Sequence, residues 1–341
     1  MYFSRVHLIN FRPFSDIVFN LEETTLITGR NGSGKTSILE AIHVLLKSRS
    51  FRTSSINSLI TREKENFILS AKLGEDLLVF EKKRRNQATN NGYKTEDYKY
   101  KNFPILINNF SLAFLESDKE LRRKILDYFM FHVKHDYADN LKKFKKTLFS
   151  RNMALKKNNE EEINIWTKLL VEHAEKITND REEIFNKVIE NVPKFFLNLP
   201  LDKKWKKIID EMSLDFYKGW EKGELIEALR KNFQEDMKRG YTKFGPQRFD
   251  LEINISKDKA GNVLSRGEQK LLILLIFLCF GEFTANNTYR RVYYLIDDAT
   301  AEFDEENLYL ALKSLEKVKG QKIISSIKKP ENIKFNSVID L

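Results

Sequence analysis

The segment GRNGSGKT, residues 29–36, has the residue types and spacing of a phosphate-binding loop. It fits the pattern G-x-x-x-x-G-K-[ST] and lies between a strand-like and a helix-like segment, as that motif requires. Its glycines let the backbone wrap around a phosphate, and amides at the helix N-terminus would face the anion. In such loops the lysine reaches the β- and γ-phosphates and the last hydroxyl coordinates magnesium. We therefore predict a site for ATP and Mg²⁺ formed by Gly29, Arg30, Asn31, Gly32, Ser33, Gly34, Lys35, Thr36 and Ser37.

Two adjacent carboxylates, Asp297 and Asp298, follow the apolar run VYYLI. Ligands of open α/β sheets bind beyond the carboxyl ends of the strands, so a strand over 292–296 would present both acids to a ligand. We expect Asp297 to hold magnesium, directly or through water, and Asp298 to position or deprotonate the attacking water, with Lys35 as the second catalytic residue. The alternative is a pair of solvated acids at a strand end, which the loop at 29–36 disfavours.

The segment LSRGEQ, residues 264–269, directly precedes an apolar, helix-like run. Ser265 and Gly267 would place a hydroxyl and an unhindered amide at a helix N-terminus, which is a suitable position for an anion. The alternative is an ordinary capping box, in which Ser265 caps the helix and Glu268 returns a hydrogen bond. Taken alone, the segment favours the capping box.

The elements around these motifs alternate strands and helices at both ends of the chain. Alternation over 3–9 and 17–28 predicts strands, and the apolar face between Ile38 and Leu46 predicts a helix after the loop. Residues 67–81 read as a hairpin that turns at 74–76. Further strands are expected at 249–255, 292–296 and 322–327, and helices at 268–283 and 305–318.

The middle of the chain has a different pattern. Residues 116–240 are mostly helical in character and densely charged, with candidate helices at 118–135, 137–158, 160–191 and 221–239. No heptad pattern continues over the three or four repeats of a coiled coil, so at most a short antiparallel coil is expected. We assign domain I, an α/β domain, to 1–112 and 241–341, and domain II, a helical insert, to 113–240.

The charge balance points to an anionic partner. The chain has 341 residues, a net charge of +10 and a pI of about 9.3. That balance favours nucleic acid or an anionic surface, although lysine used generally on exposed positions would give the same value. Tyrosines at 93, 98 and 100 alternate with lysines and give weak support for base stacking. The basic clusters are Lys82–Arg85, Lys142–Lys146 with Arg151, Lys156 and Lys157, and Lys203–Lys207.

Cysteine usage and hydropathy argue for a reducing, cytoplasmic setting. The single cysteine, Cys279, excludes an internal disulfide and a cysteine-based zinc site. It lies in the apolar run 271–280, which is too short to cross a bilayer core of about 30 Å and reads as a buried helix. The N-terminal segment lacks the apolar stretch of a secretory signal, so no membrane partner is expected.

Together the three motifs resemble the ATPase head of ABC-type proteins such as the structural-maintenance and Rad50-like families, and the chain is most similar to the RecF family. The resemblance covers nearly the whole chain in the family's order. Gln247 replaces a usual histidine, Pro13 replaces an asparagine, and no Q-loop residue is found near 108–111. The matching segments are LINFRPFSD, NGSGKTSILEAI, LRRKILD at 121–127, GPQRFDLEI at 245–253, LSRGEQKLL and LIDDATAEFD.

The resemblance implies an α/β fold, an ABC-type (Rad50-like) head built from both chain ends with a helical insert. It implies that ATP on one subunit meets Ser265 and Gly267 of a second subunit, so that ATP joins a head-to-head homodimer and slow, DNA-stimulated hydrolysis releases it. Arg12 would lie near the phosphates, and residues 301–304 would form the D-loop.

The implied partners are duplex DNA near gaps or junctions and mediator proteins of the RecO and RecR type, in support of recombinase loading. The alternative is an ATP-gated clamp of another RecF-like system, such as phage defence. A transporter ATPase subunit is disfavoured by the Arg12 region, the missing Q-loop glutamine and the large insert.

Overall fold

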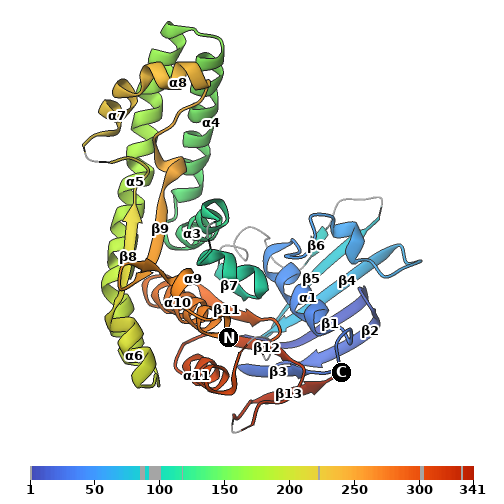
Figure 1. Ribbon diagram of the computed structural model, residues 1–341. Helices are drawn as coiled ribbons and strands as arrows, with labels where there is room; N and C mark the ends of the chain where they lie inside the picture. The colour runs from blue at the N-terminus through green and yellow to red at the C-terminus, as the bar shows by residue number, and fades with distance from the viewer. Residues whose placement is uncertain are drawn as a thin grey trace. The chain divides into compact units, whose positions relative to one another are not determined.

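The computed structural model describes residues 2–84, 89–91, 101–116, 118–221, 223–299, 303–331 and 333–341. The chain forms two compact units (Figure 1). The first contains residues 1–112 and 265–341, and the second contains residues 113–264. The tyrosines at 93, 98 and 100, together with Arg85, lie outside the described residues.

A five-stranded parallel sheet forms one half of the first unit, in the order β13-β3-β12-β11-β7. Its strands come from both ends of the chain, which confirms the predicted α/β head. The three central strands have almost continuous apolar or buried positions, as expected for a parallel sheet covered on both faces. The strands are β3 (Thr24–Thr28), β7 (Asn102–Ile107), β11 (Arg291–Ile296), β12 (Gln321–Ser326) and β13 (Ser337–Asp340).

The other half of this unit is an antiparallel sheet in the order β2-β1-β4-β5-β6. The predicted hairpin is confirmed: Leu73 pairs with Asp76, and Gly74 adopts a φ of 64° in the turn. The strands are β1 (Phe3–Phe11), β2 (Phe14–Asn20), β4 (Asn66–Leu73), β5 (Asp76–Lys83) and β6 (Thr89–Asn91), and a short 3-10 helix, η1 (Ile56–Leu59), precedes β4.

Helix α1 (Lys35–Lys47) connects the two sheets of this unit (Figure 1). Its apolar face joins one buried cluster with Val6 and Leu8 of the antiparallel sheet and with Leu295 and Ile323 of the parallel sheet. The helix that carries the lysine and threonine of the loop is thereby fixed from both sides. Burial of this kind contributes roughly 25 cal/mol per Å² of apolar surface.

Helices α10 (Arg266–Asn287) and α11 (Glu305–Leu315) complete the first unit. Every residue of α10 from Leu271 to Gly281 is buried, which confirms the predicted buried helix. Burial of Cys279, with a smaller effect of Glu282, raises the pKa of its thiol to about 12. Within the described residues, no helix is long and apolar enough to cross a membrane.

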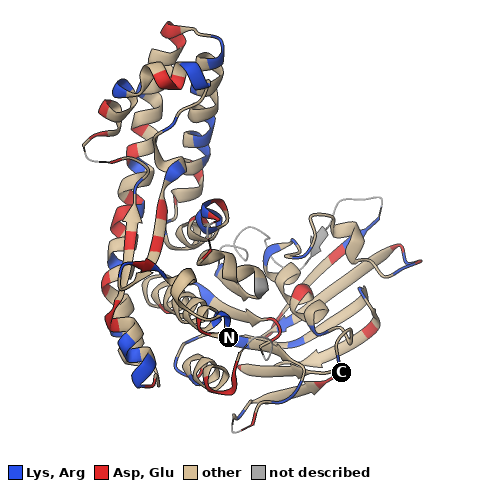
Figure 2. Cartoon of the chain, viewed as in Figure 1, with Lys and Arg blue, Asp and Glu red and all other residues tan. Residues whose placement is uncertain are grey.

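The second unit is built on an antiparallel pair of long helices, α4 (Tyr137–Lys156) and α5 (Glu160–Leu197). Charge is divided between them, with blue segments along α4 and many red segments on α5 (Figure 2). Helix α5 runs past its expected end at 191 and through Pro193. The remaining helices are α3 (Lys119–Val133), α6 (Lys203–Asp210), α7 (Leu225–Lys231), α8 (Phe233–Arg239), α9 (Ala260–Val263), η2 (Asn109–Phe114, which crosses the boundary between the units) and η3 (Pro246–Arg248).

The expected boundary at residue 241 differs from the structure, because residues 241–264 belong to the second unit. In this unit β9 (Asp250–Ile255) pairs antiparallel with β8 (Met212–Tyr217), and β10 (Asp258–Lys259) extends the same small sheet. The alternating pattern of β9 predicts a strand but carries no information about its partner. The partner strand β8 lies in the segment 116–240, for which the sequence pattern predicts mostly helix.

Buried arginine–carboxylate pairs hold the second unit together. Arg122 binds both carboxylate oxygens of Asp250 at 2.6 and 2.9 Å. Arg151 is 1% exposed and pairs with Asp236 at 2.9 Å. Arg151 was predicted as part of a basic surface cluster, and that prediction is wrong, because its guanidinium is taken up by a buried carboxylate.

Candidate nucleotide-binding and catalytic site

The loop between β3 and α1 needs glycine for two reasons, its backbone conformation and its packing. Gly34 has a φ of 106°, and a Cβ placed there would lie 2.5 Å from Cζ of Phe14. A Cβ on Gly29, whose φ is 152°, would lie 2.8 Å from the carbonyl oxygen of Leu341. Side chains at either position would force the loop open, so the predicted Gly-rich motif is also required by this fold.

Lys35 begins α1 and folds back over the loop. Its Nζ donates to the carbonyl oxygens of Gly29 at 2.7 Å and Arg30 at 3.0 Å. These are neutral acceptors, and a charged phosphate oxygen accepts a stronger hydrogen bond from an ammonium group. The side chain is therefore held at the loop in a position where an anion can compete for it.

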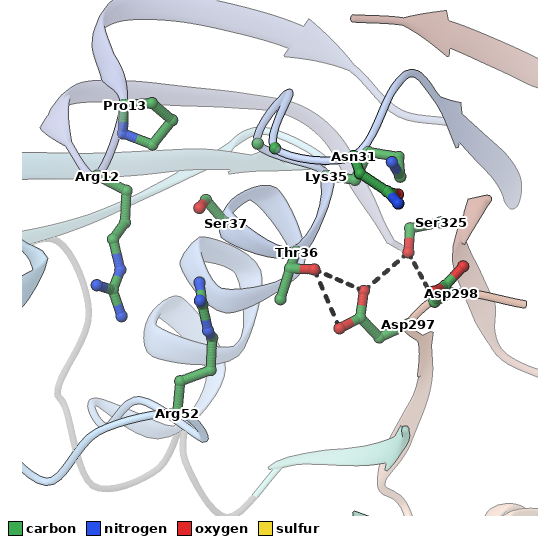
Figure 3. A pocket seen from close by; sticks show the side chains of 12 residues that line it. Arg12, Pro13, Asn31, Lys35, Thr36, Ser37, Arg52, Asp297, Asp298 and Ser325 are labelled. Atoms are coloured by element: carbon green, nitrogen blue, oxygen red, sulfur yellow. Dashed lines mark hydrogen bonds between the residues drawn. The ribbon is translucent and has the colours of Figure 1, made fainter. Parts of the chain in front are cut away.

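Thr36 and Asp297 meet at the carboxyl end of the parallel sheet (Figure 3). The Thr36 hydroxyl donates to Oδ1 of Asp297 at 2.9 Å and to Oδ2 at 3.1 Å. Ser325 of β12 donates to Oδ1 of Asp297 at 2.8 Å. A hydroxyl and a carboxylate give the hard oxygen donors that Mg²⁺ prefers, and Mg²⁺ is often held by one or two carboxylates together with substrate phosphates. The residues present therefore fit the ion.

Asp298 occupies an unusual backbone conformation beside this group, with a φ of 54°. Its N–H donates to the hydroxyl of Ser325 at 2.8 Å, and Lys270 donates to its carbonyl oxygen at 3.3 Å. Within the described part of the chain, Oδ1 of Asp298 is buried and has no hydrogen-bond partner. A buried acceptor without a donor costs roughly 1–3 kcal/mol, so this atom is suited to accept from a water or a ligand.

These groups line one cavity of about 420 Å³. The size is within the range of small-molecule sites. The cavity also includes Ser325, Pro13 and Arg52, which the sequence did not predict as site residues. The predicted site residues that it brings together are Arg12, Asn31, Gly32, Gly34, Lys35, Thr36, Ser37, Asp297 and Asp298.

Arg12 reaches the cavity from the turn between β1 and β2, where its φ is 54°. Its guanidinium binds the fully buried carboxylate of Glu40 through two hydrogen bonds of 2.8 and 2.9 Å. Arg52 approaches the same carboxylate at 3.5 Å. One buried acid on α1 thus orients two cations beside the loop, so the cavity has a positive wall opposite the two aspartates (Figure 3).

The chain is similar to known proteins over nearly its whole length. Residues 2–341 match the family description "RecF/RecN/SMC N terminal domain". The "DNA replication and repair protein RecF" of Francisella tularensis subsp. tularensis (strain WY96-3418) is 32% identical over 355 residues, covering 100% of this chain and 98% of its own length. The protein of the same name from Teredinibacter turnerae is 32% identical and covers 92% of this chain and 84% of its own length.

The chain belongs to the RecF family. It therefore belongs to the class of ATP-binding, ABC-type ATPases.

Among solved structures, the recombination mediator protein RecF bound to ATP, of the RecFOR pathway, has a TM-score of 0.78 at 24% identity, covering 99% of this chain and 95% of its own. An Smc head domain from Pyrococcus furiosus has a TM-score of 0.51 at 16% identity, covering 96% and 90%. At these identities the two structures support the fold alone.

In this RecF-family chain, Ser265 and Gly267 lie at the start of α10. The capping box weighed from the sequence is present: Ser265 accepts from the Glu268 N–H at 3.4 Å and its own N–H donates to the Glu268 carboxylate at 2.8 Å. Of the described residues, the lining of the cavity includes neither Ser265 nor Gly267. Of the expected D-loop, residues 301 and 302 are outside the described part, and Asp304 caps α11.

Three functional candidates of this RecF-family site were missed from the sequence: Glu40, Arg52 and Ser325. In the sequence, Glu40 is one polar position in an amphipathic helix. Its complete burial depends on tertiary packing and cannot be predicted from the helix alone. Ser325 was expected only as one position of the strand at 322–327. No Q-loop residue was found near 108–111, and in the structure this segment forms a turn. The Asn108 N–H donates to the Ser111 hydroxyl at 3.1 Å in that turn.

Proposed function

We propose that this chain is an ATP-dependent, DNA-binding recombination mediator of the RecF type, which forms an ATP-induced homodimer on duplex DNA. The observation that carries the proposal is the meeting of Lys35, Thr36, Asp297 and Asp298 in one cavity. Two segments far apart in the sequence supply a phosphate cradle and an acid pair at the same point. The names of the relatives, which are DNA replication and repair proteins, supply the biological setting.

The loop amides and Lys35 bind the phosphates of ATP in this proposal. Thr36 and Asp297 hold Mg²⁺, which would neutralise charge on the β- and γ-phosphates. Ser325 keeps Asp297 oriented through its 2.8 Å hydrogen bond. Asp298 then positions the attacking water and accepts its proton, since its unpartnered Oδ1 faces no competing donor among the described residues. General-base catalysis of this kind contributes roughly 10²–10⁴-fold.

A second copy completes the site in this proposal. Ser265 and Gly267 occupy a helix N-terminus, which attracts an anion, and they lie outside the lining of the cavity within their own chain. We infer that they contact the γ-phosphate held by a partner subunit, so that ATP stabilises the dimer and hydrolysis releases it. Slow, DNA-stimulated turnover and partners of the RecO and RecR type are part of the same proposal, because a structural neighbour is described as a member of the RecFOR pathway.

Light scattering of the purified chain tests this function. The mass is measured without nucleotide, with ADP, with ATP, and with ATP and a gapped duplex. We expect the mass to double with ATP and Mg²⁺ but not with ADP, and DNA affinity to increase with ATP and to fall steeply with salt. A chain that stays monomeric with ATP and ignores DNA would contradict the proposal.

A further inference from the structure

The outer face of α4 carries an ordered stripe of side chains that the nucleotide site does not use. Lys142, Lys146, Phe149, Met153 and Lys156 follow the spacing i, i+4, i+7, i+11 and i+14. Residues at that spacing lie on one side of a helix. The stripe, called the α4 stripe below, covers about 21 Å at 1.5 Å per residue. It therefore has the length of a short docked helix or peptide.

The α4 stripe lies opposite the face by which α4 packs in its own unit. The packed face contains Phe144, Thr147, Arg151, Ala154 and Leu155, all of which are buried. Those side chains contact the neighbouring helices of the unit, and α4 makes its contacts chiefly with α5 and α8. The α4 stripe therefore takes no part in the core of its own unit.

Apolar side chains occupy the centre of the stripe. Phe149 is 67% exposed and Met153 is 39% exposed, and they lie one turn apart. Lys146 precedes them and Lys156 follows them by three residues each. An apolar centre with a polar, solvent-accessible rim is the usual anatomy of a protein–protein interface. Aromatic side chains and methionine are the residue types enriched at such centres.

The lysines of the stripe are not used in ion pairs with the described residues of their own unit. Within the described residues, no ion pair joins Lys142, Lys146 or Lys156 to a carboxylate. Helix α4 has one acidic residue, Asp139, against six lysines and arginines, whereas α5 has nine acidic residues against five basic ones. Most acids of the hairpin are therefore on the other helix (Figure 2), and the charge of the stripe is open to a partner.

We propose that the α4 stripe is the docking site of an acidic, amphipathic protein segment, which presents two adjacent apolar side chains between carboxylates. Charge complementarity would steer its approach, and Phe149 with Met153 would provide the desolvated contact. A DNA backbone fits less well, because it satisfies the lysines but leaves the two apolar side chains against sugar and phosphate. The proposal is independent of the nucleotide site, which has none of these residues.

The test begins with selection of 16-residue peptides from a random display library on the full-length chain. Enriched peptides should carry two apolar residues three or four positions apart, flanked by aspartate or glutamate. The best peptide is then labelled, and its affinity is measured by fluorescence anisotropy at several salt concentrations. Affinity for a 20-base-pair duplex is measured in parallel on the same protein.

Two variants divide the stripe into its parts. Phe149→Gln with Met153→Gln should weaken peptide binding by about tenfold or more. The matched control is Ile165→Gln with Leu169→Gln on α5, whose side chains are similarly exposed at 59% and 38%. Lys142→Gln, Lys146→Gln and Lys156→Gln together should lower both the affinity and its salt dependence. The control for this triple lysine variant removes the same charge at Lys203, Lys206 and Lys207 of α6.

The proposal fails if no such peptides are enriched, or if the enriched peptides bind the Phe149/Met153 variant as well as the unchanged chain. It also fails if the lysine variant loses about tenfold in affinity for the duplex while the Phe149/Met153 variant keeps its affinity for both the duplex and the peptide. The face would then be a nucleic-acid surface. Circular dichroism and ATP binding, measured on each variant, show whether the fold and the nucleotide site remain intact. If the unchanged chain does not bind ATP, the proposed function is contradicted, whereas the docking proposal for the α4 stripe is unaffected.

Discussion

The hydroxyl of Thr36 donates to both carboxylate oxygens of Asp297, which is 261 residues further along the chain. This contact joins the first helix after the phosphate-binding loop to the end of β11. It places a hydroxyl and a carboxylate, both oxygen donors of the kind that Mg²⁺ prefers, within hydrogen-bond distance of each other. The same carboxylate is oriented by Ser325, so the three side chains form one polar group at the edge of the sheet.

Replacing Lys35 by alanine should weaken nucleotide binding strongly and prevent nucleotide-induced dimerisation. The ammonium group is the loop's charged donor, and hydrogen bonds to charged groups contribute about 1.5–3 kcal/mol, which corresponds to roughly 10–100-fold in affinity. Isothermal titration calorimetry with ATP measures the loss. Lys317→Ala, at an exposed position beyond α11, is the control and should bind ATP as the unchanged chain does. Dimers that still form with ATP in Lys35→Ala would contradict the assignment.

Replacing Asp298 by asparagine should trap the ATP-bound dimer. The variant keeps the shape of the side chain but cannot accept the proton of the attacking water, so we expect hydrolysis to fall by roughly 10²–10⁴-fold. ATP affinity should change little, because Asp297 and Thr36 are intact. Phosphate release and light scattering measure the two effects. Turnover at the original rate in Asp298→Asn would assign the base to another residue.

Substitutions at Ser265 and Glu268 distinguish a capping role of Ser265 from a role in binding a partner's nucleotide. Ser265→Arg should leave ATP binding intact and block both dimerisation and hydrolysis. Glu268→Ala removes the other half of the capping box and should cost about 1 kcal/mol of stability, with hydrolysis preserved. Thermal unfolding and phosphate release are compared for both variants. If the two substitutions change hydrolysis to the same extent, Ser265 acts only as a helix cap.

The buried histidine of α1 should make the protein sensitive to mild acid. Burial lowers the pKa of His43 from 6.5 to about 4, while the hydrogen bond to the Arg49 carbonyl opposes this shift. The folded-state pKa is below the unfolded value, so the contribution is complete above pH 6.5 and is lost as pH falls towards 4. At pH 5 the loss amounts to about 2 kcal/mol.

Urea unfolding at pH 7.5 and pH 5.0 measures this contribution. His43→Gln, which can retain a donor to the Arg49 carbonyl, should show a smaller fall in the free energy of unfolding between the two pH values. The control is His135→Gln, because the side chain of His135 is fully exposed. An identical fall in His43→Gln and in the unchanged chain would show that His43 does not contribute.

The sequence determined the parts of this protein whose information is local. The loop at 29–36, the strand directly before Asp297 and the capping box at Ser265 could all be predicted, because spacing, apolar pattern and residue type act within a few neighbouring residues. The α/β head and its origin from both ends of the chain followed from the same patterns. Family resemblance added the expectation of a shared site between two subunits.

Only the tertiary structure decided the contacts between distant segments. It buried Glu40 beneath Arg12 and Arg52, joined Ser325 to Asp297, and enclosed Arg151 against Asp236 where the sequence suggested an exposed cation. It also assigned residues 241–264 to the second unit through the pairing of β9 with β8. The physical reason is the same in each case: a side chain's burial and its partner depend on which elements pack together, and strand pairing and packing partners are not local properties of the sequence.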